Sequence, residues 1–441
     1  MAAVTVAGDE LQIELSTGEK WAALRNADLH IPLTDVIGVE RVAEPFRLVH
    51  GLRAPGLAVP WRTRIGTWRS SGRKIFAVTR AALPGIRILL RGNDFNEVLV
   101  SLPDPAAVAA VIAASVPSSP QDGQPVERLL TFRSAGVDLA GTALLPAPGQ
   151  PVNAAAVIVT GSGQLDRNGN DRRAPIDVSR QLAIALEAKG IATLRYDKRG
   201  VGASGGDFLR SGFHDNIDDA GAALTTLAEQ PECASVPLVI IGHSEGAMIA
   251  TAVAADPTAG LAGVVLLAGP ATTGEQTLQW QAARIAPTLP KPVQLILRVF
   301  RTDPAKRQRA FITKIRHTTR DAQRLGPARI NAKWFRELLD FDPVPLLAAI
   351  KVPVLAITGD KDLQVNPADL DVIAATVPGE VSTHRIVNLT HILRLDPAEP
   401  TLGAYRKLIK QPVDPVVLQL ISDWVADLPD AGSELGGPTA G

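Results

Sequence analysis

Hydrophobic positions follow two different patterns along the 441-residue chain. In the first part, short apolar runs rich in β-branched residues alternate with Gly, Pro, Asn or Asp, which is typical of antiparallel strands; the runs are residues 11–15, 36–42, 74–78, 86–90 and 98–102. Asp104 is then a suitable helix N-cap, Pro105 suits the first helical position, and residues 106–114 continue a helix. We therefore expect a small, mainly-β domain over residues 1–115, closed by one helix.

In the second part, strands and helices alternate. Apolar runs predict buried strands, and apolar residues at helical spacing predict helices between them; the strands are 157–160, 191–196, 238–241, 263–267 and 354–358, and the helices are 178–189, 217–229 and 247–255. Asp414 and Pro415 begin a closing helix. This order implies a mostly parallel, doubly wound α/β sheet over residues 127–430.

Three segments depart from these patterns. Residues 116–126 are rich in Pro, Ser and Gly, so we expect a linker there. Between about 272 and 346 the alternation stops and helical segments take over. We expect residues 431–441 to form a disordered tail.

Composition narrows the classes of partner and cofactor. Lys plus Arg and Asp plus Glu both number 45, so no overall field attracts nucleic acid. Cys233 is the single cysteine, which excludes an intramolecular disulfide and a four-cysteine metal site and fits a reducing compartment. The seven histidines lack metal-ligand spacing, so we expect no metal and no cofactor. With no signal-peptide pattern and no apolar run of about 18 residues, we expect a cytoplasmic protein without integral membrane association.

The sharpest chemical motif is Gly242-His243-Ser244-Glu245-Gly246, where a predicted strand meets a predicted helix. A serine nucleophile on a strained strand-to-helix turn needs small residues two positions to either side, because neighbouring backbone approaches closely there. The alternative is an ordinary glycine loop, but the flanking strand and helix favour the nucleophile. We therefore predict that Ser244 is the nucleophile.

A serine needs a histidine to take its proton, and the histidine needs an acid to fix its tautomer. In this topology the expected chain order is serine, acid, histidine. Asp360 and Asp362 both follow a predicted strand directly, and either is a candidate acid. His391 lies on a loop after the predicted strand 385–388 and is the candidate base, whereas His384 lies too early, at the head of that strand.

Together these motifs resemble the α/β-hydrolase superfamily, in particular esterases and dienelactone hydrolases, over about residues 126–428. The resemblance implies that the acid is Asp362, which ends a Gly-x-x-Asp pattern that starts at Gly359. It also implies that the insertion at about 272–346 forms a helical cap over the nucleophile. The family often has Asn before its histidine, and Thr390 in that position is a departure.

Acyl transfer also needs two backbone N–H groups aimed at the developing oxyanion. One is expected from Glu245, the residue after the nucleophile. Residues 160–163 (Thr-Gly-Ser-Gly) look like the family's His-Gly-Ser-Gly-Pro loop, with Thr160 in place of histidine. By position Ser162 supplies the second N–H group, and Gly161 is the alternative. A phosphate-binding loop is excluded because no lysine follows at P-loop spacing.

Residues 195–206 resemble the strand-to-loop signature of the same family. The glycines of this segment do not have a dinucleotide-binding context, because no helix starts directly after them. We expect Asp197 and Arg199 to brace the active-site loops rather than to react.

The predicted cap carries an uneven charge. Between residues 291 and 336 thirteen basic residues face two acids, Asp303 and Asp321; the basic residues are Lys291, Arg298, Arg301, Lys306, Arg307, Arg309, Lys314, Arg316, Arg320, Arg324, Arg329, Lys333 and Arg336. One interpretation is a solvated helical face whose counter-charges lie elsewhere, and the other is attraction of an anionic substrate or surface.

The first part of the chain resembles a bacterial pleckstrin-homology-like domain, mainly over residues 68–80 and 93–105. Its basic stretch is either a solvated strand edge or a site for an anionic headgroup; the residues are Arg62, Arg64, Arg69 and Arg73. We expect this domain to dock against the hydrolase half or a second subunit, which leaves a homo-oligomer and a protein or lipid contact open.

The sequence therefore predicts a serine hydrolase that cleaves a small-molecule carboxylic ester through an acyl-enzyme intermediate. The acyl-CoA thioesterase, peptidase and acyltransferase alternatives use the same three residues. A non-enzyme alternative is a binding or scaffold protein with an inert hydrolase domain, but a degenerate enzyme is expected to have lost part of the triad.

Overall fold

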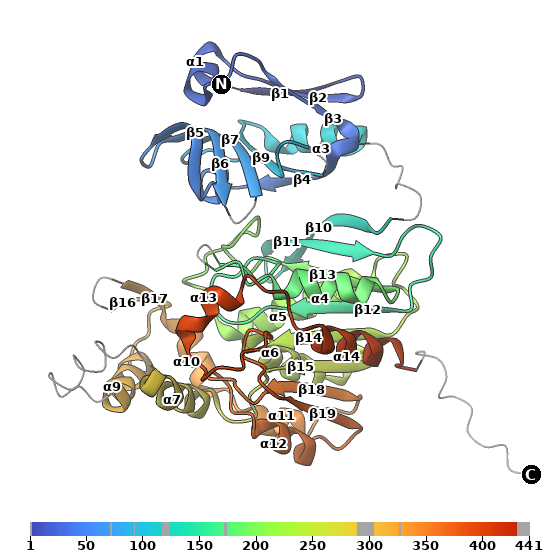
Figure 1. Cartoon of the computed structure of the whole chain (residues 1–441), viewed down its shortest axis with the longest axis vertical. Coiled ribbons are helices and arrows are strands. Elements are labelled where there is room, and N and C mark those ends of the chain that lie inside the picture. Colours follow the sequence, from blue (N-terminus) through green and yellow to red (C-terminus); the bar gives the residue numbers. More distant parts are fainter. Residues whose placement is uncertain are drawn as a thin grey trace, which may run out of the picture.

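The computed structural model describes residues 2–70, 73–91, 93–116, 124–171, 174–288, 304–325 and 328–429. Most of the predicted linker and the predicted tail lie outside these residues. Three sheets and one hairpin organise the described chain, with the N-terminal sheets in blue above the large sheet in Figure 1.

The N-terminal part contains two sheets. The first is antiparallel, with strands β1 (Ala3–Ala7), β2 (Glu10–Glu14) and β3 (Leu29–Pro32), and helix α1 (Thr17–Ala23) precedes β3. The second has the order β4 (Val36–Val42), β8 (Gly85–Leu90), β9 (Glu97–Ser101), β7 (Arg73–Arg80), β6 (Thr63–Ser70) and β5 (Leu52–Val59). Helix α2 (Pro45–Leu48) follows β4, and α3 (Pro105–Ser115) begins at its cap Asp104, whose side chain accepts from Ala107 N. The predicted small, mainly-β part that precedes the large sheet is confirmed, while its pleckstrin-homology-like character stays a prediction.

The large sheet has eight strands in the order β10 (Val126–Ser134), β11 (Val137–Leu145), β13 (Ile191–Tyr196), β12 (Ala154–Val159), β14 (Leu238–His243), β15 (Gly263–Leu267), β18 (Val354–Gly359) and β19 (Val381–Ile386). From β13 to β19 all neighbours are parallel, whereas β10 and β11 pair antiparallel at one edge. The mostly parallel sheet is therefore confirmed, and the antiparallel hairpin β10–β11 was not predicted.

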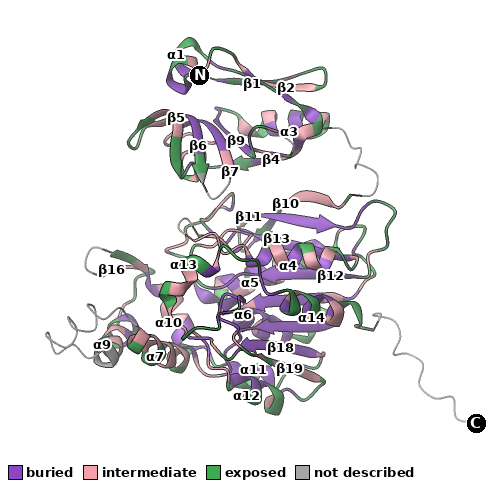
Figure 2. Ribbon diagram, viewed as in Figure 1, coloured by how far each residue is buried: buried purple, intermediate pink, exposed green. Residues whose placement is uncertain are grey.

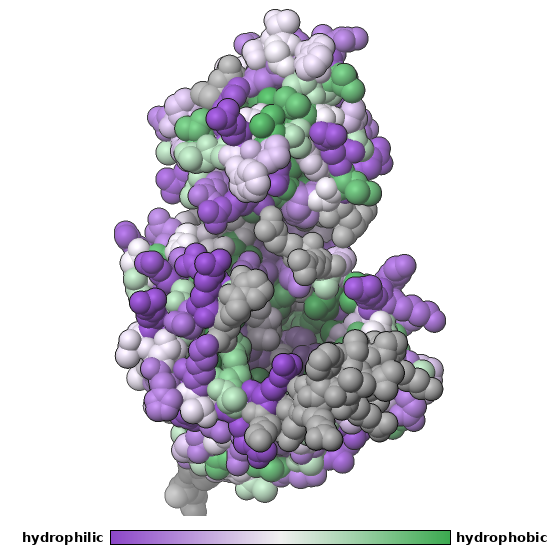
Figure 3. Space-filling model, turned by 90° about the vertical axis from the view of Figure 1, so that its left-hand side faces the viewer, coloured by the Kyte–Doolittle hydropathy of each residue, from purple (hydrophilic) through white to green (hydrophobic). Residues whose placement is uncertain are grey.

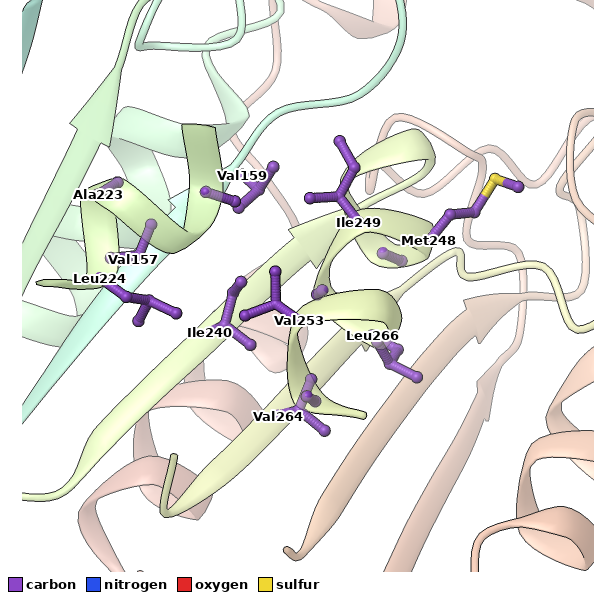
Figure 4. Packing of buried hydrophobic residues seen from close by; sticks show 14 of the residues in the cluster. Val157, Val159, Ala223, Leu224, Ile240, Met248, Ile249, Val253, Val264 and Leu266 are labelled. Atoms are coloured by element: carbon purple, nitrogen blue, oxygen red, sulfur yellow. The ribbon is translucent and has the colours of Figure 1, made fainter. Parts of the chain in front are cut away.

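Helices cover both faces of this sheet, as the predicted doubly wound architecture requires. Helices α5 (Phe213–Ala228), α6 (Glu245–Ala254) and α12 (Asp369–Thr376) contribute to one buried cluster, and α4 (Val178–Glu187) and α14 (Pro415–Ala426) to another. Figure 2 shows the inner strands of this sheet buried, while the edge strands β10 and β19 are mostly intermediate or exposed. Figure 4 shows side chains of α5 and α6 packed over β12, β14 and β15. This packing holds the carboxyl ends of the strands in place.

The insertion after β15 is mainly helical. It contains α7 (Gly274–Ile285), η3 (Ala286–Thr288), α9 (Pro304–Arg316), α10 (Ala332–Asp340) and α11 (Pro343–Leu347). A hairpin of β16 (Ala322–Leu325) and β17 (Ala328–Asn331), which was not predicted, interrupts the helices. Figure 3 views the side of the molecule on which these helices lie and shows a hollow with hydrophobic residues on its walls.

The two parts of the chain touch where β4 lies against β10. An added Cβ atom on Gly38 would lie only 2.3 Å from Leu129 Cδ1, so these strands pack closely. At the edge of this contact Arg91 and Glu127 face each other, with 3.8 Å between Nη2 and Oε2.

Candidate active site

Ser244 occupies the turn between β14 and α6. Its φ is 59° and its ψ is −118°, a conformation that L-residues rarely adopt. A Cβ atom on Gly242 would lie 2.0 Å from Gly246 O, and one on Gly246 would lie 2.2 Å from Val159 O. The motif therefore has the close backbone approach that its two glycines predict.

Ser244, His391 and Asp362 lie together in one hydrogen-bonded line. His391 Nε2 is 3.0 Å from Ser244 Oγ, and His391 Nδ1 is 2.8 Å from Asp362 Oδ2. The other oxygen of Asp362, Oδ1, accepts from the backbone N–H groups of Gln364 and Val365 at 2.7 and 2.9 Å. Because these two N–H groups fix the carboxylate, Oδ2 faces His391 Nδ1 and accepts from it when that nitrogen carries the ring proton. His391 Nε2 is then free to accept the serine proton.

The other candidates for the acid and the base lie elsewhere. Asp360 is exposed, and its Oδ1 accepts from Asn388 N at 2.7 Å. Strand β19 begins at Val381, so His384 lies inside this strand rather than at its head, which corrects the strand predicted over residues 385–388. Its Nε2 lies 3.1 Å from Ser382 Oγ.

The loop that carries His391 is held by two neighbours. Thr390 Oγ1 donates to Arg394 O at 2.8 Å, which closes the turn around His391. His243 Nε2 donates to the carbonyl oxygen of His391 at 2.8 Å. Burial, and then the nearby His391, lower the pKa of His243 to about 4, so its ring is neutral at physiological pH. The side chain of His243 therefore orients the loop, a role that the sequence did not reveal.

The predicted oxyanion loop, residues 160–163, lies directly beside the nucleophile. A Cβ atom on Gly161 would be 3.3 Å from Ser244 Cβ. Lys198 Nζ donates to Gly161 O at 2.7 Å, while the Ser162 side chain is exposed. Glu245 is the first residue of α6, where a backbone N–H group has no acceptor within the helix.

The side chain of Glu245 links three parts of the site. Its Oε1 accepts from Asn216 Nδ2 at 3.0 Å, Trp334 Nε1 at 3.1 Å and Lys198 Nζ at 3.3 Å. Trp334 belongs to α10, so the carboxylate joins the turn at Ser244 to the predicted oxyanion loop and to the insertion. Lys198 lies within the 195–206 signature and Trp334 within the insertion that the resemblance places over the nucleophile, whereas nothing in the sequence pointed to Asn216.

Part of the positive charge of the insertion is paired with acids outside the 291–336 segment. Arg316 contacts Glu275 at 2.7 Å and Asp340 at 2.5 Å, and Lys333 contacts Asp215 at 2.8 Å. Lys291, Arg298, Arg301 and Asp303 lie outside the described residues. These pairs agree with a face whose counter-charges lie elsewhere in the chain.

The buried carboxyl of Asp369 should make the stability of the fold depend on pH. Its side chain is buried and accepts from Ala271 N at 2.9 Å, yet burial raises its pKa to about 6. Because the pKa of Asp369 is higher in the folded state, its contribution to stability is full below about pH 4, where the carboxyl is protonated. This contribution is lost as the pH rises through about 6. We expect D369N to raise the unfolding free energy by about 1–2 kcal/mol at pH 7.5, and by at most about 0.5 kcal/mol at pH 4.

Thermal melts at both pH values measure this difference. The exposed Asp371 on the same helix is the control, because D371N is expected to change stability by less than about 0.5 kcal/mol at either pH. An equal gain from D369N at both pH values would contradict the assigned pKa.

Among the described residues, no group of three or more His, Cys, Asp or Glu side chains is arranged to hold a metal ion. Within the same residues no helix has both the length and the apolar character needed to span a membrane.

Comparison with known proteins gives a family and several relatives. The sequence profile of the family described as serine aminopeptidase, S33, matches residues 176–398, just over half of the chain. Esterase EstD of Thermotoga maritima is 27% identical over 278 residues, which make up 62% of this chain and 61% of that esterase. The chain thus spans less than two thirds of this curated relative.

Solved structures with lower identity are also similar. Est1E from Butyrivibrio proteoclasticus with bound ferulic acid is 16% identical, with a TM-score of 0.46 over 68% of this chain and 96% of that one. A dienelactone hydrolase from Anabaena variabilis is 18% identical, with a TM-score of 0.40 over 68% of this chain and 97% of that one.

Proposed function

This chain belongs to the serine aminopeptidase S33 family and has an α/β-hydrolase fold, as predicted, and on that premise we propose that it hydrolyses carboxylic esters with Ser244, His391 and Asp362. The hydrogen-bonded line from Ser244 Oγ through the His391 ring to Asp362 Oδ2 carries this proposal. Each member has the position that acyl transfer requires of a nucleophile, a base and an orienting acid.

The reaction follows from these positions. His391 Nε2 takes the proton of Ser244 Oγ as the oxygen attacks the ester carbonyl carbon, and then gives that proton to the departing alcohol. A water molecule then attacks the carbonyl carbon of the acyl-enzyme while His391 Nε2 takes its proton. His391 returns that proton to Ser244 Oγ as the carboxylic acid leaves. Asp362 keeps the proton on His391 Nδ1 and stabilises the imidazolium that forms in each step.

We further propose that the N–H groups of Glu245 and Ser162 stabilise the tetrahedral oxyanion. The contact of Lys198 with Gly161 O supports a role for Ser162, because it fixes the peptide that carries the Ser162 N–H group. In a planar trans peptide the C=O and N–H groups point in opposite directions. Because Lys198 holds the Gly161 carbonyl, the N–H group of Ser162 faces away from Lys198 and is fixed in that direction.

Ester and amide hydrolysis remain the two candidate activities. The named activity of the Thermotoga relative favours an ester, whereas the description of the family favours an N-terminal peptide bond. Both need the same nucleophile, and the leaving group distinguishes them.

Hydrolysis of nitrophenyl esters from acetate to palmitate, beside aminoacyl nitroanilides, tests the proposal. We expect turnover of at least one ester and slower turnover of every anilide. Mass spectrometry after treatment with a fluorophosphonate is expected to find one adduct, on Ser244. Faster turnover of the anilides would establish the peptidase instead, and a chain that neither turns over any substrate nor takes the label would refute both.

A further inference from the structure

A buried ion pair connects the N-terminal sheets to the loop beside the nucleophile. Glu40 lies on β4, and its Oε1 accepts from Arg167 Nη1 at 2.5 Å. Arg167 follows the oxyanion loop, 127 positions further along the chain. The side chains are only 6% and 7% exposed, so solvent screens this pair weakly.

Arg167 is anchored at the same time to the end of β13. Its Nη2 and Nε contact the two carboxylate oxygens of Asp197 at 2.7 and 3.2 Å, and its backbone N donates to Asp197 Oδ1 at 2.8 Å. Burial opposes ionisation of Asp197, but the charge and hydrogen bonds of Arg167 outweigh it and lower the pKa of this carboxyl. The pair therefore stays charged.

The Glu40 carboxylate also bridges two guanidinium groups. Its Oε2 accepts from Arg87 Nη1 at 3.3 Å, and Arg87 in turn donates to Glu97 Oε2 at 2.8 Å. Without the Glu40 charge, Arg167 and Arg87 would repel each other across a buried space with one acceptor fewer. The loop would then lose one of the contacts that fix Arg167, leaving Asp197 and Thr142 Oγ1 at 2.7 Å.

Residues 197 and 198 hold the oxyanion loop at two points, one within the loop and one just after it. Asp197 binds Arg167 after the loop, and the adjacent Lys198 binds the carbonyl of Gly161 within it. Because only residues 163–166 separate Ser162 from Arg167, we expect a shift of Arg167 to pull on the peptide between Gly161 and Ser162 against its contact with Lys198. A displacement of about 1 Å there is enough to cost on the order of 100-fold in rate.

We propose that Glu40 is a positioning residue for hydrolysis: through Arg167 the N-terminal sheets fix the loop that supplies the Ser162 N–H group. This inference rests on the proposed function. It gives the N-terminal part a role in transition-state stabilisation, although it contributes no group that touches the substrate.

The test compares E40Q with R91A, both at the contact between the two parts. Arg91 is half exposed and faces Glu127, so R91A perturbs the same contact without touching Arg167. We expect E40Q to lower kcat about 10- to 100-fold with KM within about threefold. Inhibition by a trifluoromethyl ketone, whose adduct carries the oxyanion, should weaken by the same factor. R91A should stay within twofold of the wild type in all three.

Coupling to Arg167 is tested by R167Q and the double variant. If Glu40 acts through Arg167, E40Q/R167Q should be no slower than R167Q alone, whereas independent effects would multiply. E40D keeps the charge but shortens the reach, and a kcat between wild type and E40Q is expected. Thermal melting and gel filtration show whether E40Q folds. If it does not, E40D replaces it in the comparison with R91A.

A kcat for E40Q within twofold of the wild type would overturn the inference, and so would an equal loss in R91A. The rate of fluorophosphonate labelling on Ser244 separates this inference from the proposed ester activity. Should the wild type take the label but hydrolyse no ester, the ester proposal fails, and a slower labelling of E40Q would still support the role of Glu40. Equal labelling rates would reject it.

Discussion

Replacing Ser244 with alanine is expected to lower kcat for ester hydrolysis by at least about a thousandfold. The hydroxyl group lies 3.0 Å from His391 Nε2, and an alanine side chain has no oxygen that could attack the ester. The proposed oxyanion donors, the backbone N–H groups of Ser162 and Glu245, stay in place, so any residual rate measures what they contribute without a nucleophile. Steady-state kinetics on the best nitrophenyl ester, with thermal melts to confirm folding, provide the measurement.

The matched control is Ser162→Ala. Its side chain is exposed, and only its backbone N–H group has a role in the proposed mechanism. Because alanine keeps that group, kcat is expected to stay within about twofold of the wild type. A loss in S162A comparable to that in S244A would mean that the Ser162 hydroxyl takes part in the reaction, and retention of more than a tenth of the activity by S244A would require another nucleophile.

The features that the sequence predicted well are those with local signals. A buried strand, a tight turn and a helix start depend mainly on adjacent residues. The sequence therefore predicted the strand at 238–241, the turn at Ser244 and the helix that begins at Asp414. The chain order of nucleophile, acid and base then limited the candidates to a few side chains. The identity of the family is confirmed by comparison, while the roles of the three residues stay proposals.

Elements without a strong apolar pattern were missed. Strand β5 contains Pro55, and exposed or half-buried residues fill both of its faces, so neither alternation nor a continuous apolar run marks it. Strand β19 is an edge strand that starts with Val381-Ser382-Thr383, which explains why the prediction placed its start four residues too late. In both cases pairing with a neighbour, rather than the strand's own composition, decides the structure.

Long-range polar contacts were beyond prediction for a different reason. Glu40 and Arg167 are far apart in sequence, and each looks like an ordinary charged residue until β4 packs on β10. The hydrogen bonds of Glu245 to Asn216 and Trp334 likewise depend on how α5 and α10 meet. Such pairs follow from the assembled fold, because burial of a charge is acceptable only where a partner arrives with it.

Replacing Asp362 with asparagine is expected to lower kcat by about three to four orders of magnitude with little change in KM. The local hydrogen bonds decide which way the new amide points. Gln364 N and Val365 N both donate to Oδ1, so the amide oxygen must remain there. Its NH₂ group then replaces Oδ2 and faces His391 Nδ1.

This orientation forces the wrong tautomer on His391. Because an NH₂ group can only donate, Nδ1 must become the acceptor, and the ring proton moves to Nε2. Nε2 then cannot take the proton of Ser244, although every residue around it is unchanged. The variant should therefore melt close to the wild type and lose almost all turnover.

Asp360→Asn is the control that makes this test specific. Asp360 lies two residues away on the same turn, is exposed, and accepts from Asn388 N through Oδ1, a bond that an asparagine oxygen can keep. We expect D360N to retain kcat within about twofold of the wild type. If D360N loses turnover and D362N keeps it, the acid is Asp360, and the contact between Asp362 and His391 only stabilises the loop. Loss in D362N alone ties the chemistry to the tautomer of His391.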